Sequence, residues 1–435
     1  MSKKPSKILA YLVVLFGGLM FLSGIAATIG YLGLPVILRN DFISETILGI
    51  QIGEMGTIFW GLIGGTLAIF HGLRSIANKP SSSLRLPPFY IFYIFFAIAL
   101  GLGTALLNSD FPNEYLFPPI FLFGAALPGF AALSWALGRL NWPISWRQGA
   151  LNYVSGNTLS ISVTILLGSI LPIIFYLLIE PLEYIVGDFI YFIDPGTSGF
   201  FERVFYSPML IFYLLYIAFQ APFPEEFAKA LGPRIMRSRI QNEAQAFALG
   251  LASGAGFAII ENMLYQGVIA SWSGWTWGGI TALRGIGAVG HSLWTGILAL
   301  AIYRERARTS GWFGRLLRAY LTSVGLHTLW NGGYMALFYV VGLEYYADAG
   351  PELSVYGEYI TFSLIFILVA MTAFNWWILA RITANLAQDD ASDLALAQVS
   401  PRILAYWALA SAAIIIPIGA ALGGALPEIK KILFP

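Results

Sequence analysis

Four short stretches of the chain carry side chains whose types and spacing suit acid–base chemistry. They lie between Pro208 and Gly342 and read Glu225-Glu226-Phe227-Ala228-Lys229, Phe257-Ala258-Ile259-Ile260-Glu261-Asn262, His291-Ser292-Leu293-Trp294-Thr295 and His327-Thr328-Leu329-Trp330-Asn331. A carboxylate within hydrogen-bond reach of a water molecule can act as a general base. An imidazole and an amide can stabilise a developing oxyanion. Because the chain has no cysteine, the set predicts hydrolysis that uses no thiol nucleophile.

The spacing within each stretch predicts which side chains lie together. Residues four apart share one face of a helix, which pairs Glu225 with Lys229, Phe257 with Glu261, His291 with Thr295, and His327 with Asn331. Lipid cannot satisfy such groups, so in a membrane they should point inward and meet one another. We therefore expect four consecutive helices to aim these groups at one point.

The composition indicates that lipid surrounds most of the chain. Of 435 residues, 58% are hydrophobic and only 11% are charged, whereas soluble domains carry about 25% charged residues. About 20 apolar residues cross a bilayer as a helix. The sequence thus predicts an all-α, polytopic transmembrane helical bundle of about eleven spans, centred near Leu19, Phe59, Ala97, Phe123, Leu167, Leu214, Gly254, His291, Asn331, Val369 and Ala413. The net charge of +1 offers no field that would attract nucleic acid.

Loop charges predict the orientation of these spans. Arginine and lysine gather in alternate connections, and acidic residues gather in the others. The positive-inside rule then places the N-terminus in the cytoplasm and the C-terminus outside, in a multi-pass protein of the cell membrane. Trp272, Trp275 and Trp277 fall where an outer aromatic belt is expected.

The chain divides into three regions by motif content. Residues 1–203 form an N-terminal transmembrane bundle of about five spans, residues 204–342 hold the four motifs and form a catalytic transmembrane core, and residues 343–435 supply C-terminal transmembrane helices. Counting along the helices places Glu261 deeper than Glu225. We therefore expect a tilted or broken helix to bring the two carboxylates together.

Together, the four motifs resemble those of the PrsW family of intramembrane peptidases. That family has a Glu-Glu-x-x-Lys motif, a Phe-x-x-x-Glu-Asn motif and two later helices that contain histidine. It is related to the CAAX prenyl protease family, whose first motif has an arginine one position later, and Lys229 has the PrsW spacing. Each motif alone is weak, but four in order on successive spans are specific.

The resemblance implies an intramembrane endopeptidase of the glutamate type that needs no cofactor. By position, Glu225 or Glu226 is the base, Glu261 and His291 are further catalytic groups, and His327 with Asn331 contributes to the oxyanion site. Supporting roles fall to Lys229, Phe257, Asn262 and Arg284. The implied partners are the lipid bilayer and a membrane-anchored protein substrate, of which an anti-sigma-factor-like regulator is one kind; nucleic acid is not expected.

Each of these groups also has a plainer interpretation. Glu225 and Glu226 could begin a helix after two prolines, where acids favour the helix dipole. Glu261 could be a neutral acid in an interhelical hydrogen bond, but Arg284 predicts an ion pair that keeps it charged. His71, beside a cytoplasmic loop, is interpreted as interfacial and without a function.

Two other functions fit parts of the pattern. Glu225, Glu261, His291 and His327 are admissible zinc ligands, although the chain contains no His-Glu-x-x-His element. Intramembrane acids and histidines also build proton relays in transporters, but the sequence shows no clear internal repeat. A scaffold that has lost catalysis is a further reading, which complete motifs disfavour.

Overall fold

The computed structural model describes residues 7–37, 54–109, 115–168, 170, 208–270, 274–305, 311–346, 351–387 and 401–413. These parts are almost entirely helical and contain no β-strand, which confirms the predicted all-α class. The first half contains α1 (Lys7–Ile37), α3 (Gly65–Ile76), α4 (Phe89–Leu107), α5 (Phe117–Arg139), α6 (Trp146–Ser155) and α7 (Ile161–Gly168). Two π-helical segments, Phe59–Gly64 and Gly156–Ser160, precede α3 and α7.

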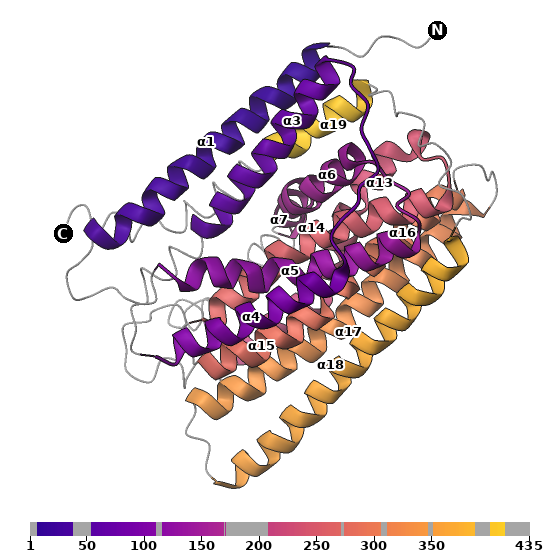
Figure 1. Ribbon diagram of the computed structural model, residues 1–435. Coiled ribbons are helices and arrows are strands. Elements are labelled where there is room, and N and C mark those ends of the chain that lie inside the picture. Colours follow the sequence, from indigo (N-terminus) through magenta and orange to yellow (C-terminus); the bar gives the residue numbers. More distant parts are fainter. Residues whose placement is uncertain are drawn as a thin grey trace, which may run out of the picture.

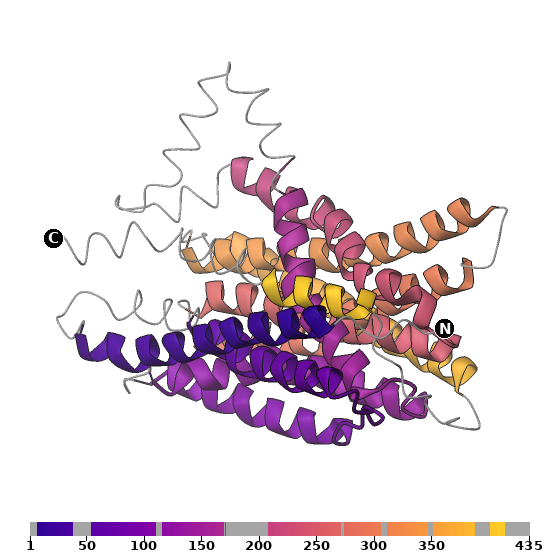
Figure 2. The same cartoon turned by 90° about the horizontal axis from the view of Figure 1, so that it is seen from above.

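The second half supplies the four motif helices. It contains α11 (Pro208–Phe219), α12 (Pro222–Lys229), α13 (Leu231–Met236), a 3-10 turn at Arg237–Arg239, α14 (Glu243–Ile269), α15 (Gly274–Gly287), α16 (Val289–Arg304), α17 (Trp312–Tyr346), α18 (Pro351–Leu386) and α19 (Pro401–Ala412). Most of the long helices run side by side along one direction (Figure 1). Seen from above, indigo α1 lies at one margin with yellow α19 beside it (Figure 2).

Eight helical segments of the described chain are long and apolar enough to cross a membrane, so the protein is a multi-pass membrane protein. They are Ile8–Gly33, Glu54–Ile76, Phe89–Leu107, Phe117–Arg139, Trp146–Gly168, Glu243–Gly267, Gly274–Arg304 and Gly357–Leu386. The predicted centre Leu167 lies at the end of the span Trp146–Gly168, so the fifth span was placed too late in the chain. The other three predicted centres, Leu214, Asn331 and Ala413, lie in α11, in α17 and directly after α19. The three-region division and the orientation remain predictions.

The helices α14 and α16 form the centre of the bundle. They contact each other closely, and α14 also packs on α5 and α6. Small residues permit this approach: a Cβ added to Gly254 would overlap the backbone carbonyl of His291. Asn242 caps the start of α14, because its side-chain oxygen accepts a hydrogen bond from the backbone N–H of Gln245 at 2.8 Å. These contacts fix the height at which the motif residues of α14 and α16 face each other.

Candidate active site

A short buried helix, α12, carries the paired glutamates into the bundle. The α11 helix ends at Phe219, and α12 begins at Pro222, which suits a first helical turn because proline has no N–H to pair. This break is the broken helix that the sequence required. The last turn is held by two serines, since Ser160 donates to the carbonyl of Ala228 at 3.1 Å and Ser253 donates to that of Lys229 at 2.8 Å.

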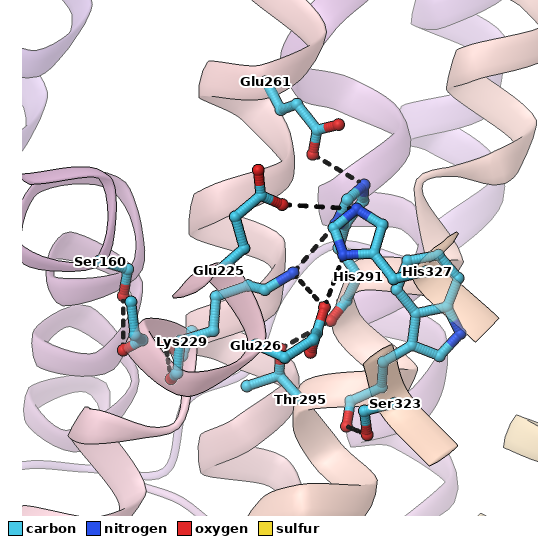
Figure 3. A network of polar contacts seen from close by, with 12 residues as sticks. Ser160, Glu225, Glu226, Lys229, Glu261, His291, Thr295, Ser323 and His327 are labelled. Carbon is cyan, nitrogen blue, oxygen red and sulfur yellow. Dashed lines mark hydrogen bonds and ion pairs between the residues drawn. The ribbon is translucent and has the colours of Figure 1, made fainter. Parts of the chain in front are cut away.

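Glu226 is the centre of a polar network that involves four helices (Figure 3). Its Oε1 accepts from Lys229 Nζ at 2.5 Å and contacts His327 Nδ1 at 2.9 Å. Lys229 Nζ also lies 3.3 Å from His291 Nδ1 and 4.5 Å from the centre of the Phe257 ring. Glu226, Lys229 and His327 are all fully buried. The network therefore ties α12 to α14, α16 and α17.

Glu261 is held between a histidine and an arginine. Its Oε1 accepts from Arg284 Nη2 at 3.1 Å, so the predicted ion pair is present, and its Oε2 lies 3.0 Å from His291 Nε2. Arg284 Nε also donates to Asn262 Oδ1 at 3.0 Å. A buried carboxylate that retains a positive partner in this way can stay charged.

Tyr265 and Tyr334 sandwich the Arg284 guanidinium, whose carbon lies 4.2 Å and 4.7 Å from their ring centres. Sequence analysis missed both tyrosines. The spacing of Tyr265, four residues after Glu261 and on the same helix face, was a usable signal. Tyr334 lies three residues after Asn331 and offered a similar one. Ser160 and Ser253, which secure α12, left no comparable signal.

Glu225 differs from the other two carboxylates because it has no cation of its own. Its Oε2 lies 3.4 Å from His327 Nε2, but the contact lacks hydrogen-bond geometry, and neither atom has another partner in the described chain. Glu261 Oε2 and both side-chain atoms of Asn331 are also buried without a hydrogen-bond partner there. One oxygen each of Glu225 and Glu261 and one nitrogen of His327 lie within 4.8 Å of one another.

The contacts indicate which nitrogen of each histidine carries the proton. His327 Nδ1 faces a carboxylate oxygen, which accepts only, so that nitrogen donates and Nε2 keeps a lone pair. His291 Nδ1 faces the ammonium of Lys229, which donates only, so its Nε2 carries the hydrogen; this nitrogen lies 3.0 Å from Glu261 Oε2 without hydrogen-bond geometry. When His327 is neutral and Glu225 is ionised, His327 Nε2 and Glu225 Oε2 are therefore two hydrogen-bond acceptors that face each other.

The balance of charges in the cluster also leaves one carboxylate without a cation. The described cluster holds three carboxylates, Glu225, Glu226 and Glu261, against two fixed cations, Lys229 and Arg284. An uncompensated charge away from water is costly. The point between Glu225 and His327 therefore calls for a proton, a hydrogen-bonding water or a cation.

The donor set at this point suits a divalent metal. Glu225, Glu261 and His327 offer two carboxylate oxygens and an imidazole nitrogen, all unpartnered in the described residues, and these are ligand types that zinc accepts. The opposite nitrogen of His327 contacts Glu226, which matches the usual carboxylate support of a metal-bound histidine. A second group, Glu226, His291 and His327, fits less well because Lys229 Nζ already lies against two of its members.

The third histidine lies elsewhere. His71, interpreted from sequence as interfacial, is only 2% exposed and lies against Trp407 of α19, with 5.4 Å between ring centres. The aromatic belt is also wrong for Trp277, which is fully buried, whereas Trp275 is 77% exposed; Trp272 lies outside the described residues.

Comparison with known proteins agrees with the motifs. Residues 163–371 match the family model described as PrsW family intramembrane metalloprotease. No curated protein matches the chain, and no solved structure matches it. The matched region covers slightly less than half of the chain and contains all four motifs and the whole buried cluster, so this region is similar to the PrsW family of intramembrane proteases.

Proposed function

We propose that the protein hydrolyses peptide bonds of membrane-anchored proteins at the buried cluster, with a water molecule activated between Glu225 and His327. One observation carries the proposal: an oxygen each of Glu225 and Glu261 and a nitrogen of His327 lie within 4.8 Å of one another inside a helical membrane bundle, and each of these side chains has a buried polar atom without a partner in the described chain. Hydrolysis requires a water molecule within hydrogen-bond reach of a carboxylate that can accept its proton.

In this proposal Glu225 is the general base. Glu226 is held by Lys229 and His327, and Glu261 is held by Arg284, so Glu225 is the carboxylate that can accept a proton from water. Glu226 and Lys229 are positioning residues, because they fix the ring of His327 and the height of α12.

The remaining polar groups serve the water and the oxyanion. The lone pair of His327 Nε2 accepts the second hydrogen of the water and orients its oxygen toward the peptide carbon. Asn331 Nδ2, buried and unpartnered in the described chain, donates to the oxyanion that forms. His291 Nε2 lies 3.0 Å from Glu261 Oε2 and packs against this carboxylate. This arrangement assigns Asn331, rather than His327, as the direct oxyanion donor.

A second candidate is the same hydrolysis with a divalent metal at this point, favoured by the donor set and by the family's description. Glu225, Glu261 and His327 would hold the metal, which would lower the pKa of a bound water and polarise the peptide carbonyl. Glu226 would then orient His327 through its Nδ1 hydrogen.

The substrate class follows from the location of the cluster. Its side chains are buried among helices of membrane-spanning length, so the bond to be cut must enter from within or beside the membrane. A single-span protein such as an anti-sigma-factor-like regulator meets this requirement.

The test uses purified protein in liposomes with a panel of single-span peptides, and mass spectrometry detects the products. Glu225→Gln, Glu226→Gln, Glu261→Gln and His291→Ala are compared with the parent, each with and without a chelator. Metal content of the parent and of Glu225→Gln is measured on the same preparations.

We expect cleavage by the parent that Glu225→Gln abolishes and that a chelator leaves unchanged. Loss on chelation, recovery with zinc and metal that is absent from Glu225→Gln would replace this mechanism with the metal-assisted one. Full activity of Glu225→Gln would overturn the assignment of the base. No cleavage of any peptide would contradict the proposed function, and the next measurement would be proton flux in the same liposomes.

A further inference from the structure

A stripe of buried polar side chains leads away from the cluster toward the connection between α14 and α15. On α14, Asn262 and Gln266 are four residues apart and share a face; on α15, Arg284, Thr281 and Trp277 follow the same rule. Gln266, Thr281 and Trp277 are 0% exposed. In the other direction along α14, buried Phe247 and Leu251 are apolar, and buried Gln245 and Ser253 are hydrogen-bonded. On the described parts of α14 and α15, the buried polar atoms without a partner therefore lie between Glu261 and the connection of these two helices.

Hydrogen bonds connect this stripe to Glu261. Arg284 bonds Glu261 with Nη2 and Asn262 with Nε, and Asn262 Nδ2 in turn donates to the carbonyl of Ala125 at 3.3 Å. The preceding residue of α5, Gly124, faces the same stripe. A Cβ built on it would lie 3.4 Å from Thr281 Cγ2, 3.8 Å from Gln266 Oε1 and 3.9 Å from the Trp277 ring.

Most polar atoms of the stripe have no partner in the described chain. These atoms are Gln266 Oε1 and Nε2, Thr281 Oγ1, Trp277 Nε1 and Arg284 Nη1. Buried polar groups are nearly always hydrogen-bonded, and leaving several unsatisfied in one place would be costly. Buried water meets such a need where polar groups lie together.

We propose that Gln266, Thr281, Trp277 and Arg284 bind a short file of water molecules that supplies the reacting water from the membrane face where α14 and α15 are joined. The inference rests on the proposed function for its purpose, since hydrolysis consumes one water per bond. The water file itself is a separate physical claim that is measurable without turnover.

The first experiment measures access of a water-borne probe. The chain contains no cysteine, so Thr281→Cys and, as the matched control, Ile280→Cys each provide a single thiol on α15. Intact protein in liposomes is exposed to silver ion, which is small enough to follow water, and the thiol left unreacted is titrated with a maleimide after denaturation.

The expected order of reactivity is opposite to that of exposure. Ile280 is 6% exposed and Thr281 is 0% exposed, so in a dry interior Ile280→Cys would react at least as fast. We expect Thr281→Cys to react about 10-fold faster, because a hydrated site admits the ion while an apolar one excludes it. Equal rates, or a faster reaction of Ile280→Cys, would overturn the water file.

The second experiment measures whether peptide turnover depends on the water file. Thr281→Val combined with Gln266→Leu removes the polar atoms and keeps the bulk, and Thr383→Val is the control, because Thr383 is equally buried but its hydroxyl bonds within α18. We expect about 10-fold slower peptide turnover at unchanged KM, equivalent to about 1.4 kcal/mol of barrier, with no loss for Thr383→Val. Unchanged turnover would overturn the supply role.

The two experiments distinguish a failure of the proposed function from a failure of the water file. If the parent cleaves no peptide, the proposed function fails, yet the silver reactivity still decides whether the stripe holds water. If the parent cleaves and the thiols react alike, the water file fails alone. Thermal unfolding of each variant identifies any that has lost its fold.

Discussion

The innermost and outermost helices of this protein use apolar residues for opposite purposes. The span in α14 has 89% of its window buried inside the protein, whereas the span in α18 has 22%. The exposed side chains of α18 include Phe362 and Phe366, which point outward. The buried side chains of α14 include Glu261, Asn262 and Gln266. Lipid stabilises the first arrangement and cannot satisfy the second. Of these two spans, the central one therefore has the lower mean hydropathy, 1.4 against 2.0.

The largest expected effect concerns a carboxylate inside the cluster and one outside it. Glu225→Gln should lower peptide turnover by about 10²- to 10⁴-fold, the usual contribution of a general base, without changing the melting temperature. Glu54→Gln, which alters an acid in another span, should leave turnover unchanged. Turnover in liposomes measures both, and equal losses would erase the distinction between the two regions.

Breaking the buried ion pair should come next. Arg284→Met leaves Glu261 without its cation and should cost about 3–5 kcal/mol of unfolding free energy. Denaturant titration in detergent measures the loss. Adding Glu261→Met should restore much of it, because the unpaired charge is then gone. A double variant as unstable as the single one would show that packing, rather than charge, supports this point.

A methyl group should act differently on the inner and outer helices. Gly254→Ala places a Cβ against the carbonyl of His291 and should destabilise the protein by about 1–3 kcal/mol. Gly18→Ala on α1, where no atom lies within 4 Å of the new Cβ, should be neutral or stabilising by up to about 1 kcal/mol. Thermal unfolding of the two variants compares a glycine between packed helices with a glycine that has open space around it. If both substitutions shifted the melting temperature in the same direction, the close approach of α14 and α16 would be contradicted.

The smallest effect is expected at the helix ends. Arg304 bonds Glu243 through two nitrogens at 2.9 Å and 2.7 Å, but both side chains are well exposed, at 48% and 39%. Arg304→Met should therefore cost only about 0.2–1 kcal/mol, and high salt should reduce the difference from the parent. A loss as large as that of Arg284→Met would mean that burial does not separate these two pairs.

Sequence alone predicted much of the site because lipid restricts the alternatives. Polar groups on four spans had to turn inward, and the Arg284–Glu261 pair followed from depth and charge. Depth also required a tilted or broken helix, but the position of the break, between α11 and α12, comes from the structure. The sequence did not decide the roles of residues that depend on contacts between helices. The choice between Glu225 and Glu226 is an example: spacing paired Lys229 with Glu225, but the ammonium lies on Glu226.

The remaining errors have the same physical origin. Trp277 was expected in an interfacial aromatic belt and His71 at the membrane interface, because both lie near the ends of spans. Neighbouring helices cover them instead, with Phe117 of α5 packed on Trp277 and Trp407 of α19 packed on His71. Residue type and position predict depth in a membrane, but not which distant helix packs against a side chain.

The length of α12 has a consequence for the dynamics of the protein. Its eight residues carry Glu225 and Lys229, and two residues separate it from α11 and one from α13. The buried contacts of Glu226, Ala228 and Lys229 oppose local opening of this segment, and any opening would separate Glu225 from His327. Hydrogen–deuterium exchange of the amides from Phe227 to Ala230 would then report the fraction of molecules in which the site is assembled, and a peptide that slows this exchange would be one that the site holds.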